Sequence, residues 1–337
     1  MNILIADDDP VALLILRNVL EKSGHQVETA CNGREALSLL RRGTSHAVIS
    51  DWEMPEMNGI EFCKAVRRES FSSYIYFVLL TSHDDSERMI AGLSAGADDF
   101  LSKPFCPAEL TARMQTAARI LALETRDITI FALAKLAESR DPETGDHLER
   151  VRGYCQLLAQ ELAQTDKFRG VIDAEFVNLI YMTSPLHDIG KVGIPDSILL
   201  KPGRLTDREF AIMKMHAEIG AQTLDAAMKK YPGVRFLEMA RDIAASHHEW
   251  VDGSGYPCGL AGENIPLCGR IMALADVYDA LTARRVYKAA FTHERANGII
   301  LGESGTHFDP DIVQTYVRCE DRFTAIHDTF NDLAAAA

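Results

Sequence analysis

The sequence lacks the cysteine spacing of a disulfide-stabilised or zinc-ribbon protein. It has seven cysteines in 337 residues, an odd number, and no two of them form a CxxC motif. It also lacks a run of about 20 apolar residues, the length that a helix needs to cross a bilayer. Three aspartates directly follow residues 1–6, a pattern that excludes a signal peptide. These absences predict reduced thiols and a cytoplasmic protein.

Positive charge is scarce as well. Thirty-five basic residues against 49 acidic ones give a net charge of −14. Such a chain is not drawn to DNA or to an anionic membrane surface, so we expect neither as a partner. With 47% hydrophobic and 25% charged residues, the composition is typical of a folded, water-soluble protein. The length exceeds that of one ordinary domain and predicts two.

Residues 1–120 alternate short apolar runs with amphipathic stretches. The expected strands are residues 2–6, 26–29, 46–50, 75–81 and 98–101. Strands that alternate with helices form a parallel sheet covered on both faces, and ligands bind at the carboxyl ends of its strands. Asp7, Asp8, Asp51, Thr81 and Lys103 all fall at or just after these ends. The pattern predicts a doubly wound α/β domain with three carboxylates, a hydroxyl and an amine at one rim.

The second half of the chain is helical in pattern. No glycine or proline interrupts residues 109–140, which predicts one long helix or two helices that break near Arg126. Further helices are expected at residues 148–162, 174–181, 207–226, 237–248 and 270–283. We therefore expect a first domain over residues 1–120, a helical linker over 121–139, an all-α domain over 140–330 and a tail over 331–337.

The rim of the first domain predicts phosphoryl chemistry. Three carboxylates suit a hard cation such as Mg²⁺, and an aspartate beside that cation can attack a phosphoryl group. The strings are DD at 7–8, DWEMP at 51–55, TS at 81–82 and KPF at 103–105. Together they resemble the receiver domain of response regulators, a flavodoxin-like fold. The resemblance implies that Asp51 accepts phosphate from a sensor histidine kinase, with Asp7 and Asp8 at Mg²⁺ and with Thr81 and Lys103 on the phosphoryl oxygens.

Histidines and carboxylates recur through the second half. A lone histidine on an apolar helix is usually a packed core residue, but here five occur with three acids: Glu143, His147, His187, Asp188, His216, His247, His248 and Asp276. Imidazole and carboxylate together suit iron, manganese, nickel or zinc. The lack of cysteine ligands argues against a structural zinc site.

Two strings identify the second half more closely. HDIGK at 187–191 and HHEWVDGSGYP at 247–257 resemble the HD-GYP family of cyclic di-GMP phosphodiesterases. The resemblance runs from about residue 137 to about residue 325 and includes GKVGIPD at 190–196 and ADVYDALT at 275–282. It implies an all-α HD-type domain with two or three divalent transition metals, most often iron, with manganese or nickel as alternatives.

The resemblance assigns a role to each residue of the set. The metal ligands are Glu143, His147, His187, Asp188, His216, His247, His248 and Asp276, with Asp188 as the bridge between metals. Asp188 and Lys191 are the expected catalytic pair, and Lys191 also contacts a substrate phosphate. Glu143 is associated with a third metal, although a carboxylate at a helix start is also favoured by the helix dipole.

Other residues are expected to shape the substrate site. Arg285 and Lys288 match the family's phosphate-binding pair, with Val286 in place of the usual proline between them. The loop around Tyr256 either helps to form the substrate cleft, contacts a partner such as a diguanylate cyclase, or simply turns the chain. Asp279 either supports a metal-bound histidine or caps a helix.

The resemblance implies a response regulator that hydrolyses cyclic di-GMP to pGpG, and then to GMP, under the control of phosphorylation at Asp51. One alternative is a phosphodiesterase that prefers pGpG or another cyclic dinucleotide. Another is a non-catalytic signalling adaptor. A DNA-binding output is excluded because the second half has no basic recognition helix. The sequence leaves a homodimer open.

Overall fold

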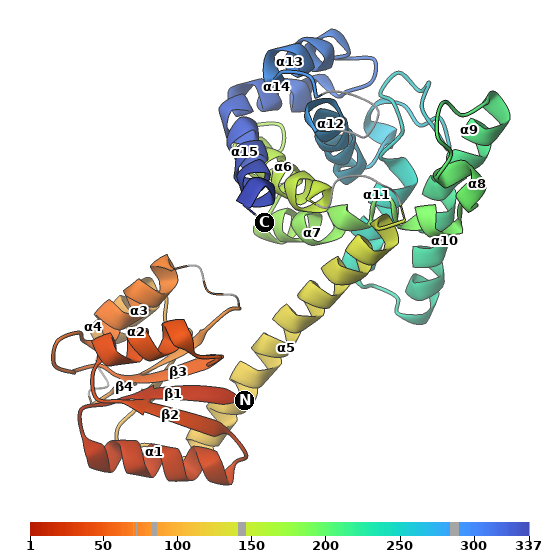
Figure 1. The fold of residues 1–337 in the computed structure, drawn as a ribbon. Coiled ribbons are helices and arrows are strands. Elements are labelled where there is room, and N and C mark those ends of the chain that lie inside the picture. Colours follow the sequence, from red (N-terminus) through yellow and green to blue (C-terminus); the bar gives the residue numbers. More distant parts are fainter. Residues whose placement is uncertain (70, 72, 83–85, 141–145, 284–289, 337) are drawn as a thin grey trace. The chain divides into compact units, whose positions relative to one another are not determined.

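The computed structural model describes residues 1–69, 71, 73–82, 86–140, 146–283 and 290–336. The chain divides into two compact units, Met1–Ile128 and Thr129–Ala337. No helix in the described ranges is both long enough and apolar enough to span a membrane. The first unit is an α/β domain and the second is helical, as the sequence predicts (Figure 1).

The first unit is built on one parallel sheet. Its strands are β1 (Asn2–Ala6), β2 (Gln26–Ala30), β3 (Ala47–Asp51), β4 (Tyr76–Thr81) and β5 (Asp99–Ser102). They lie in the order β2-β1-β3-β4-β5, and every neighbouring pair is parallel. The predicted five-stranded parallel sheet is confirmed. Since all strands point the same way, their carboxyl ends share one edge of the sheet.

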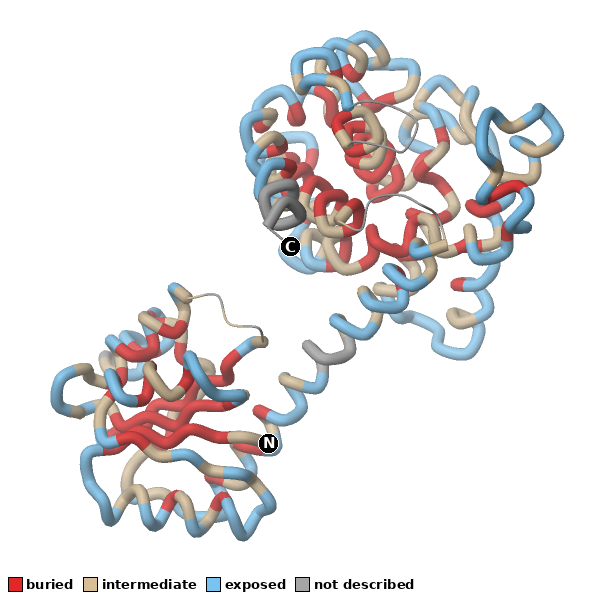
Figure 2. The backbone as a smooth tube through the Cα atoms, in the orientation of Figure 1, coloured by how far each residue is buried: buried red, intermediate tan, exposed pale blue. Residues whose placement is uncertain are grey.

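Helices cover both faces of this sheet. They are α1 (Pro10–Lys22), α2 (Gly33–Arg42), α3 (Gly59–Arg68), α4 (Ser86–Ser94) and the start of α5 (Pro107–Glu138). One apolar cluster joins the sheet to Leu37 of α2 and Phe62 of α3. The other joins it to Leu16 of α1 and Leu110 of α5. The three inner strands β1, β3 and β4 are therefore the most deeply buried elements of the unit (Figure 2).

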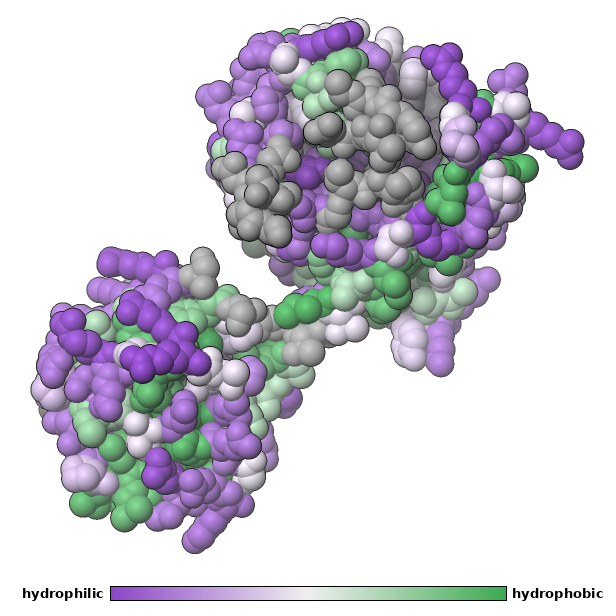
Figure 3. All heavy atoms as spheres, in the orientation of Figure 1, coloured by the Kyte–Doolittle hydropathy of each residue, from purple (hydrophilic) through white to green (hydrophobic). Residues whose placement is uncertain are grey.

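Residues 107–138 form one helix, α5, rather than two. Its first turns pack on the sheet through Leu110, Met114 and Ala117. Large hydrophobic side chains are exposed farther along it, at Ile120, Ile128, Leu133 and Leu136. The exposed surface of α5 is therefore partly apolar (Figure 3).

The second unit is all-helical. Its longer helices are α6 (His147–Leu162), α7 (Ala174–Thr183), α10 (Met215–Lys230), α11 (Arg235–Ser246), α12 (Leu267–Thr282), α13 (His293–Gly302), α14 (Pro310–Arg318) and α15 (Glu320–Ala336). Shorter ones are η1 (Ser184–Leu186), η2 (Ile189–Gly193), α8 (Asp196–Leu199), α9 (Asp207–Met213) and η3 (Gly262–Asn264). The main core packs α6 against α12, with Tyr154 and Tyr278 fully buried.

Two of the predicted helices differ from those in the structure, one by a break at Lys214 and one by an earlier end at Ser246. The helix expected over 207–226 is divided at Lys214 into α9 and α10, where the ring of His216 bonds to the carbonyl of Met213. The helix expected over 237–248 ends at Ser246, so His247 and His248 follow its C-terminus. Periodicity alone could not detect these ends, because both flanking segments keep a helical apolar pattern.

Candidate functional site

The rim of the parallel sheet carries the predicted polar residues. The Nζ atom of Lys103 lies 2.7 Å from Oδ2 of Asp7 and 2.6 Å from Oδ1 of Asp51. Asp7, Asp8 and Asp51 each offer a carboxylate oxygen within 4.8 Å of the others. Thr81 ends β4 at the same edge and is buried. The five residues that the sequence singles out therefore lie together.

Opposing effects act on the pKa of Asp51. Burial raises the pKa of its carboxyl group and the charge of Asp7 raises it further, while the bond from Lys103 lowers the pKa. A divalent cation between the three carboxylates would relieve the repulsion between Asp7 and Asp51. The arrangement suits a carboxylate that reacts beside a hard cation.

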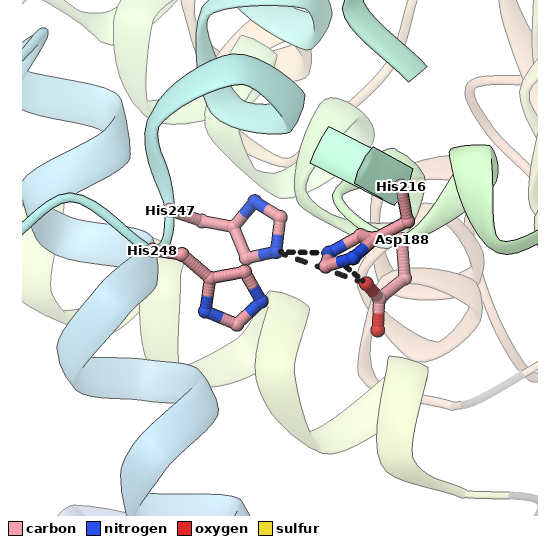
Figure 4. Close-up of side chains that lie close together, drawn as sticks. All are labelled: Asp188, His216, His247 and His248. Carbon is pink, nitrogen blue, oxygen red and sulfur yellow. Dashed lines mark hydrogen bonds and ion pairs between the residues drawn. The ribbon is translucent and has the colours of Figure 1, made fainter. Parts of the chain in front are cut away.

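The second unit gathers five of its histidines in two adjoining groups. The first consists of Asp188, His216, His247 and His248 (Figure 4). The second consists of His147, His187 and Asp276. Within each group the ligand atoms lie within 4.8 Å of one another. All seven described members of the predicted ligand set are thus brought together, whereas Glu143 lies outside the described residues.

Asp188 connects the two groups. Its Oδ1 atom lies 3.1 Å from Nε2 of His216 and 3.7 Å from Nε2 of His247. Its Oδ2 atom lies 3.3 Å from Nε2 of His187 and 2.8 Å from Nζ of Lys191. One oxygen therefore faces each group, which is the geometry of a carboxylate that can bind two cations at once.

Hydrogen bonds to the backbone fix the orientation of three imidazoles. Nδ1 of His187 donates to the carbonyl of Ser184 at 2.9 Å, and Nδ1 of His216 and His247 donate to carbonyls one turn earlier, at 2.8 and 3.0 Å. A carbonyl oxygen can only accept, so the proton sits on Nδ1. The lone pair of each Nε2 atom is then directed at Asp188, as in metal-binding histidines.

His147 is held by a carboxylate instead. Its Nδ1 atom lies 2.7 Å from Oδ2 of Asp279. Asp279 also accepts two bonds from Arg150, at 2.6 and 2.9 Å, and all three residues are buried. Burial disfavours the charge of Asp279, but Arg150 and His147 outweigh it and lower its pKa to about 2. The ionised carboxylate therefore keeps the Nδ1 proton on His147.

The protonation of the cluster suits a metal site. Burial lowers the pKa of His247 and, more strongly, that of His248, and the charges of neighbouring histidines add to the effect. Burial also opposes ionisation of Asp188, yet Lys191 and His187 hold its pKa well below the ordinary value. His247 and His248 are thus neutral imidazoles and Asp188 is an ionised carboxylate, the forms that bind divalent metals.

The side chain of Glu249 anchors the loop that follows His248. Glu249 is buried and accepts bonds from the backbone NH groups of Cys258 and Leu260, at 2.7 and 2.9 Å. A Cβ atom on Gly255 would meet the backbone nitrogen of Trp250 at 2.3 Å, so only glycine fits there. This packing places the Tyr256 ring on His248, with the ring centroids 4.6 Å apart.

Some residues at the site were not predicted from the sequence. Oε1 of Glu138, the last residue of α5, lies 3.9 Å from Nε2 of His147. Arg150 and Glu249 were also missed, and no motif spacing marks them as partners of the cluster. The predicted phosphate-binding residues Arg285 and Lys288 lie outside the described residues.

Comparison with protein families identifies both halves. Residues 3–115 match the response regulator receiver domain family, and residues 132–312 match the HD domain family. The chain is 41% identical over 99% of its length to a probable cyclic di-GMP phosphodiesterase of Vibrio cholerae, covering 81% of that protein. It is 37% identical over 99% of its length to the cyclic di-GMP phosphodiesterase response regulator RpfG of Xanthomonas campestris, covering 92% of it.

A further relative matches the second half alone. The 3′3′-cGAMP-specific phosphodiesterase 2 of Vibrio cholerae is 43% identical over 62% of this chain, and the match covers 38% of that protein. The two relatives named above match across both halves, in the order that the fold shows. This chain therefore belongs to the family of response regulators that join an N-terminal receiver domain to a C-terminal HD domain.

Proposed function

We propose that this chain hydrolyses cyclic di-GMP in its HD domain. Two relatives that match almost the whole chain are named as cyclic di-GMP phosphodiesterases. The observation that carries the proposal is the position of Asp188, whose two oxygens face two adjoining groups of imidazoles. Paired divalent cations act on phosphodiester bonds in many hydrolases.

The donor set fits divalent transition metals. It combines imidazole nitrogens with carboxylate oxygens and contains no sulfur, which suits iron, manganese or nickel. The proposed ligands are His147, His187, Asp188, His216, His247, His248 and Asp276, with Glu143 at a third metal. Bound there, the metals would polarise the phosphodiester and make water an effective nucleophile at neutral pH.

The chain's own residues would bind and orient the substrate. Lys191 carries a positive charge 2.8 Å from Asp188 and can pair with a phosphate oxygen. We assign the same role to Arg285 and Lys288. One water adds to a phosphorus atom and the ribose 3′ oxygen leaves with a proton, which yields linear pGpG. A second water cleaves pGpG into two GMP molecules.

The receiver domain would control this activity. We propose that Asp51 takes a phosphoryl group from a sensor histidine kinase, with Mg²⁺ between Asp7, Asp8 and Asp51. Lys103 already contacts Asp7 and Asp51 and would pair with the phosphoryl oxygens. Phosphorylation adds negative charge and strong acceptors at this rim, which changes the bonding of Lys103 and Thr81.

A panel of substrates tests the activity and its alternatives. The 43% identity to a 3′3′-cGAMP-specific enzyme makes a different cyclic dinucleotide the second candidate. The full chain, loaded with Mn²⁺ or Fe²⁺ without oxygen, is incubated with cyclic di-GMP, 3′3′-cGAMP or pGpG, and the products are separated by chromatography. We expect the highest kcat/KM for cyclic di-GMP, with pGpG appearing before GMP. Binding without turnover of any of the three would instead indicate a signalling adaptor.

A further inference from the structure

A third group of potential metal ligands lies outside the catalytic cluster. His293 begins α13, and His327 and Asp328 lie on α15. Each offers one ligand atom within 4.8 Å of the other two. The rings of His293 and His327 meet edge to face with centroids 5.0 Å apart. His327 is buried, His293 is partly buried and Asp328 is exposed, so solvent can reach the group from one side.

His327 and Asp328 turn toward each other although they are neighbours in the sequence. Adjacent residues on a helix point in different directions, so this contact requires both side chains to bend together. Nε2 of His327 lies 3.3 Å from the backbone carbonyl of Thr282, the last residue of α12. Because that oxygen can only accept, Nε2 carries the proton.

With the proton on Nε2, the other ring nitrogen of His327, Nδ1, carries a lone pair. Nδ1 of His327 lies 3.2 Å from Oδ1 of Asp328. In the neutral ring with its proton on Nε2, two acceptors face each other at this distance. A cation between them, either a proton or a metal ion, resolves the conflict. A tetrahedral Zn²⁺ with bonds of about 2.0–2.1 Å holds a nitrogen and an oxygen ligand about 3.4 Å apart, close to the separation found.

His293 completes the group from a second helix. The hydroxyl of Tyr278, on α12, lies 2.6 Å from Nδ1 of His293, a contact that orients the ring as outer partners orient metal-binding histidines. A neutral imidazole held in this way is the form that donates a lone pair to a metal.

We propose that His293, His327 and Asp328 form a second, separate site for one divalent transition metal of the zinc type. Two imidazoles and one carboxylate supply three ligands, and the exposed side leaves a fourth position for water. Nitrogen ligands disfavour Mg²⁺ and Ca²⁺, which prefer oxygen. The bound ion would link the start of α13 to the middle of α15.

The site is tested by comparing the zinc content of the wild type with that of variants, because the proposed catalytic cluster would also bind metal. The full chain and its Asp328→Asn variant are dialysed against buffered Zn²⁺ and analysed for metal, with the same change repeated in an Asp188→Ala background. Asp328→Asn should remove one zinc ion per chain in both backgrounds. Asp321→Asn, an exposed aspartate on the same helix, is the matched control and should remove none.

Affinity and a second variant complete the test. Outer partners of a metal site are worth about 10–100-fold in affinity, so loss of a direct ligand should weaken zinc binding by more than about 100-fold. His293→Gln should lose the same ion as Asp328→Asn, and Mg²⁺ in excess should not displace it. An unchanged zinc count in both variants would mean that a protonated His327–Asp328 ion pair occupies this place, and the site would be rejected.

Discussion

Replacing Asp279 by asparagine should weaken both the stability of the HD domain and its binding of metal. Asp279 is buried and accepts bonds from both Arg150 and His147. Asparagine has nearly the same shape but no charge, and one end of its amide group is a donor. The change therefore leaves the Arg150 guanidinium buried without its anion and removes the carboxylate that fixes the His147 tautomer.

The expected costs differ for the two effects. Breaking one partner of a buried ion pair costs about 3–5 kcal/mol of unfolding free energy, because the remaining charge stays desolvated. Loss of the carboxylate behind a metal-binding histidine costs about 10–100-fold in metal affinity. We expect Asp279→Asn to show both, a lower midpoint in chemical denaturation and weaker metal binding.

The chain contains a matched control in a second buried ion pair. Nη1 of Arg270 lies 2.5 Å from Oδ2 of Asp309, and the side chains of both residues are 8% exposed. Neither residue belongs to the predicted metal ligands. Asp309→Asn should destabilise the domain by a similar amount, and its metal content should remain that of the wild type.

A double variant separates the two effects further. Asp279→Leu combined with Arg150→Met replaces the pair with apolar side chains, which often restores stability. We expect recovery of the denaturation midpoint without recovery of metal affinity, because His147 still lacks its acceptor. Full metal affinity in Asp279→Asn, measured by titration of the chelated protein, would refute the assigned role of Asp279.

Three further predictions concern the remaining groups. Asp188 raises the pKa of His187 despite burial. Because a proton and a metal compete for that ring, the amount of metal retained in dialysis should fall as the pH drops through the raised pKa of His187. At pH values above that pKa, the retained metal should level off. Asp51→Asn should abolish the mass increase that acetyl phosphate and Mg²⁺ produce in the wild type, and persistence of that increase would move the phosphorylation site elsewhere. Glu143→Ala should lower the iron or manganese content by about one ion per chain and weaken turnover, whereas an unchanged content would make Glu143 a helix-start carboxylate.

Much of the fold and site can be predicted from the sequence because the informative residues occupy ends of regular elements. Asp51 and Thr81 follow apolar strand patterns, and parallel strands bring their carboxyl ends to one edge. The histidine-containing motifs can likewise be recognised in the sequence without exact helix boundaries. Errors arose where the ring of His216 bonds to the carbonyl of Met213, since that bond leaves no trace in hydrophobic periodicity.

Contacts between distant helices could not be predicted. Asp279 and Arg150 are separated by 129 positions, yet their side chains meet at 2.6 Å. Glu138 reaches the cluster from the end of α5, and no motif distinguishes it from other acidic residues. His293 and His327 come together only because α13 and α15 pack beside the end of α12. Such pairings depend on tertiary packing rather than on local pattern.

The most direct test of the central claim measures metal content and cyclic di-GMP turnover together in Asp188→Ala. Asp188 faces both groups of imidazoles, so its loss should remove bound metal and turnover at once while the helical signal in circular dichroism persists. Asp225→Ala, an exposed aspartate on α10, is the control and should retain both. A folded Asp188→Ala protein that keeps its metal and hydrolyses cyclic di-GMP at the wild-type rate would contradict the proposed metal centre.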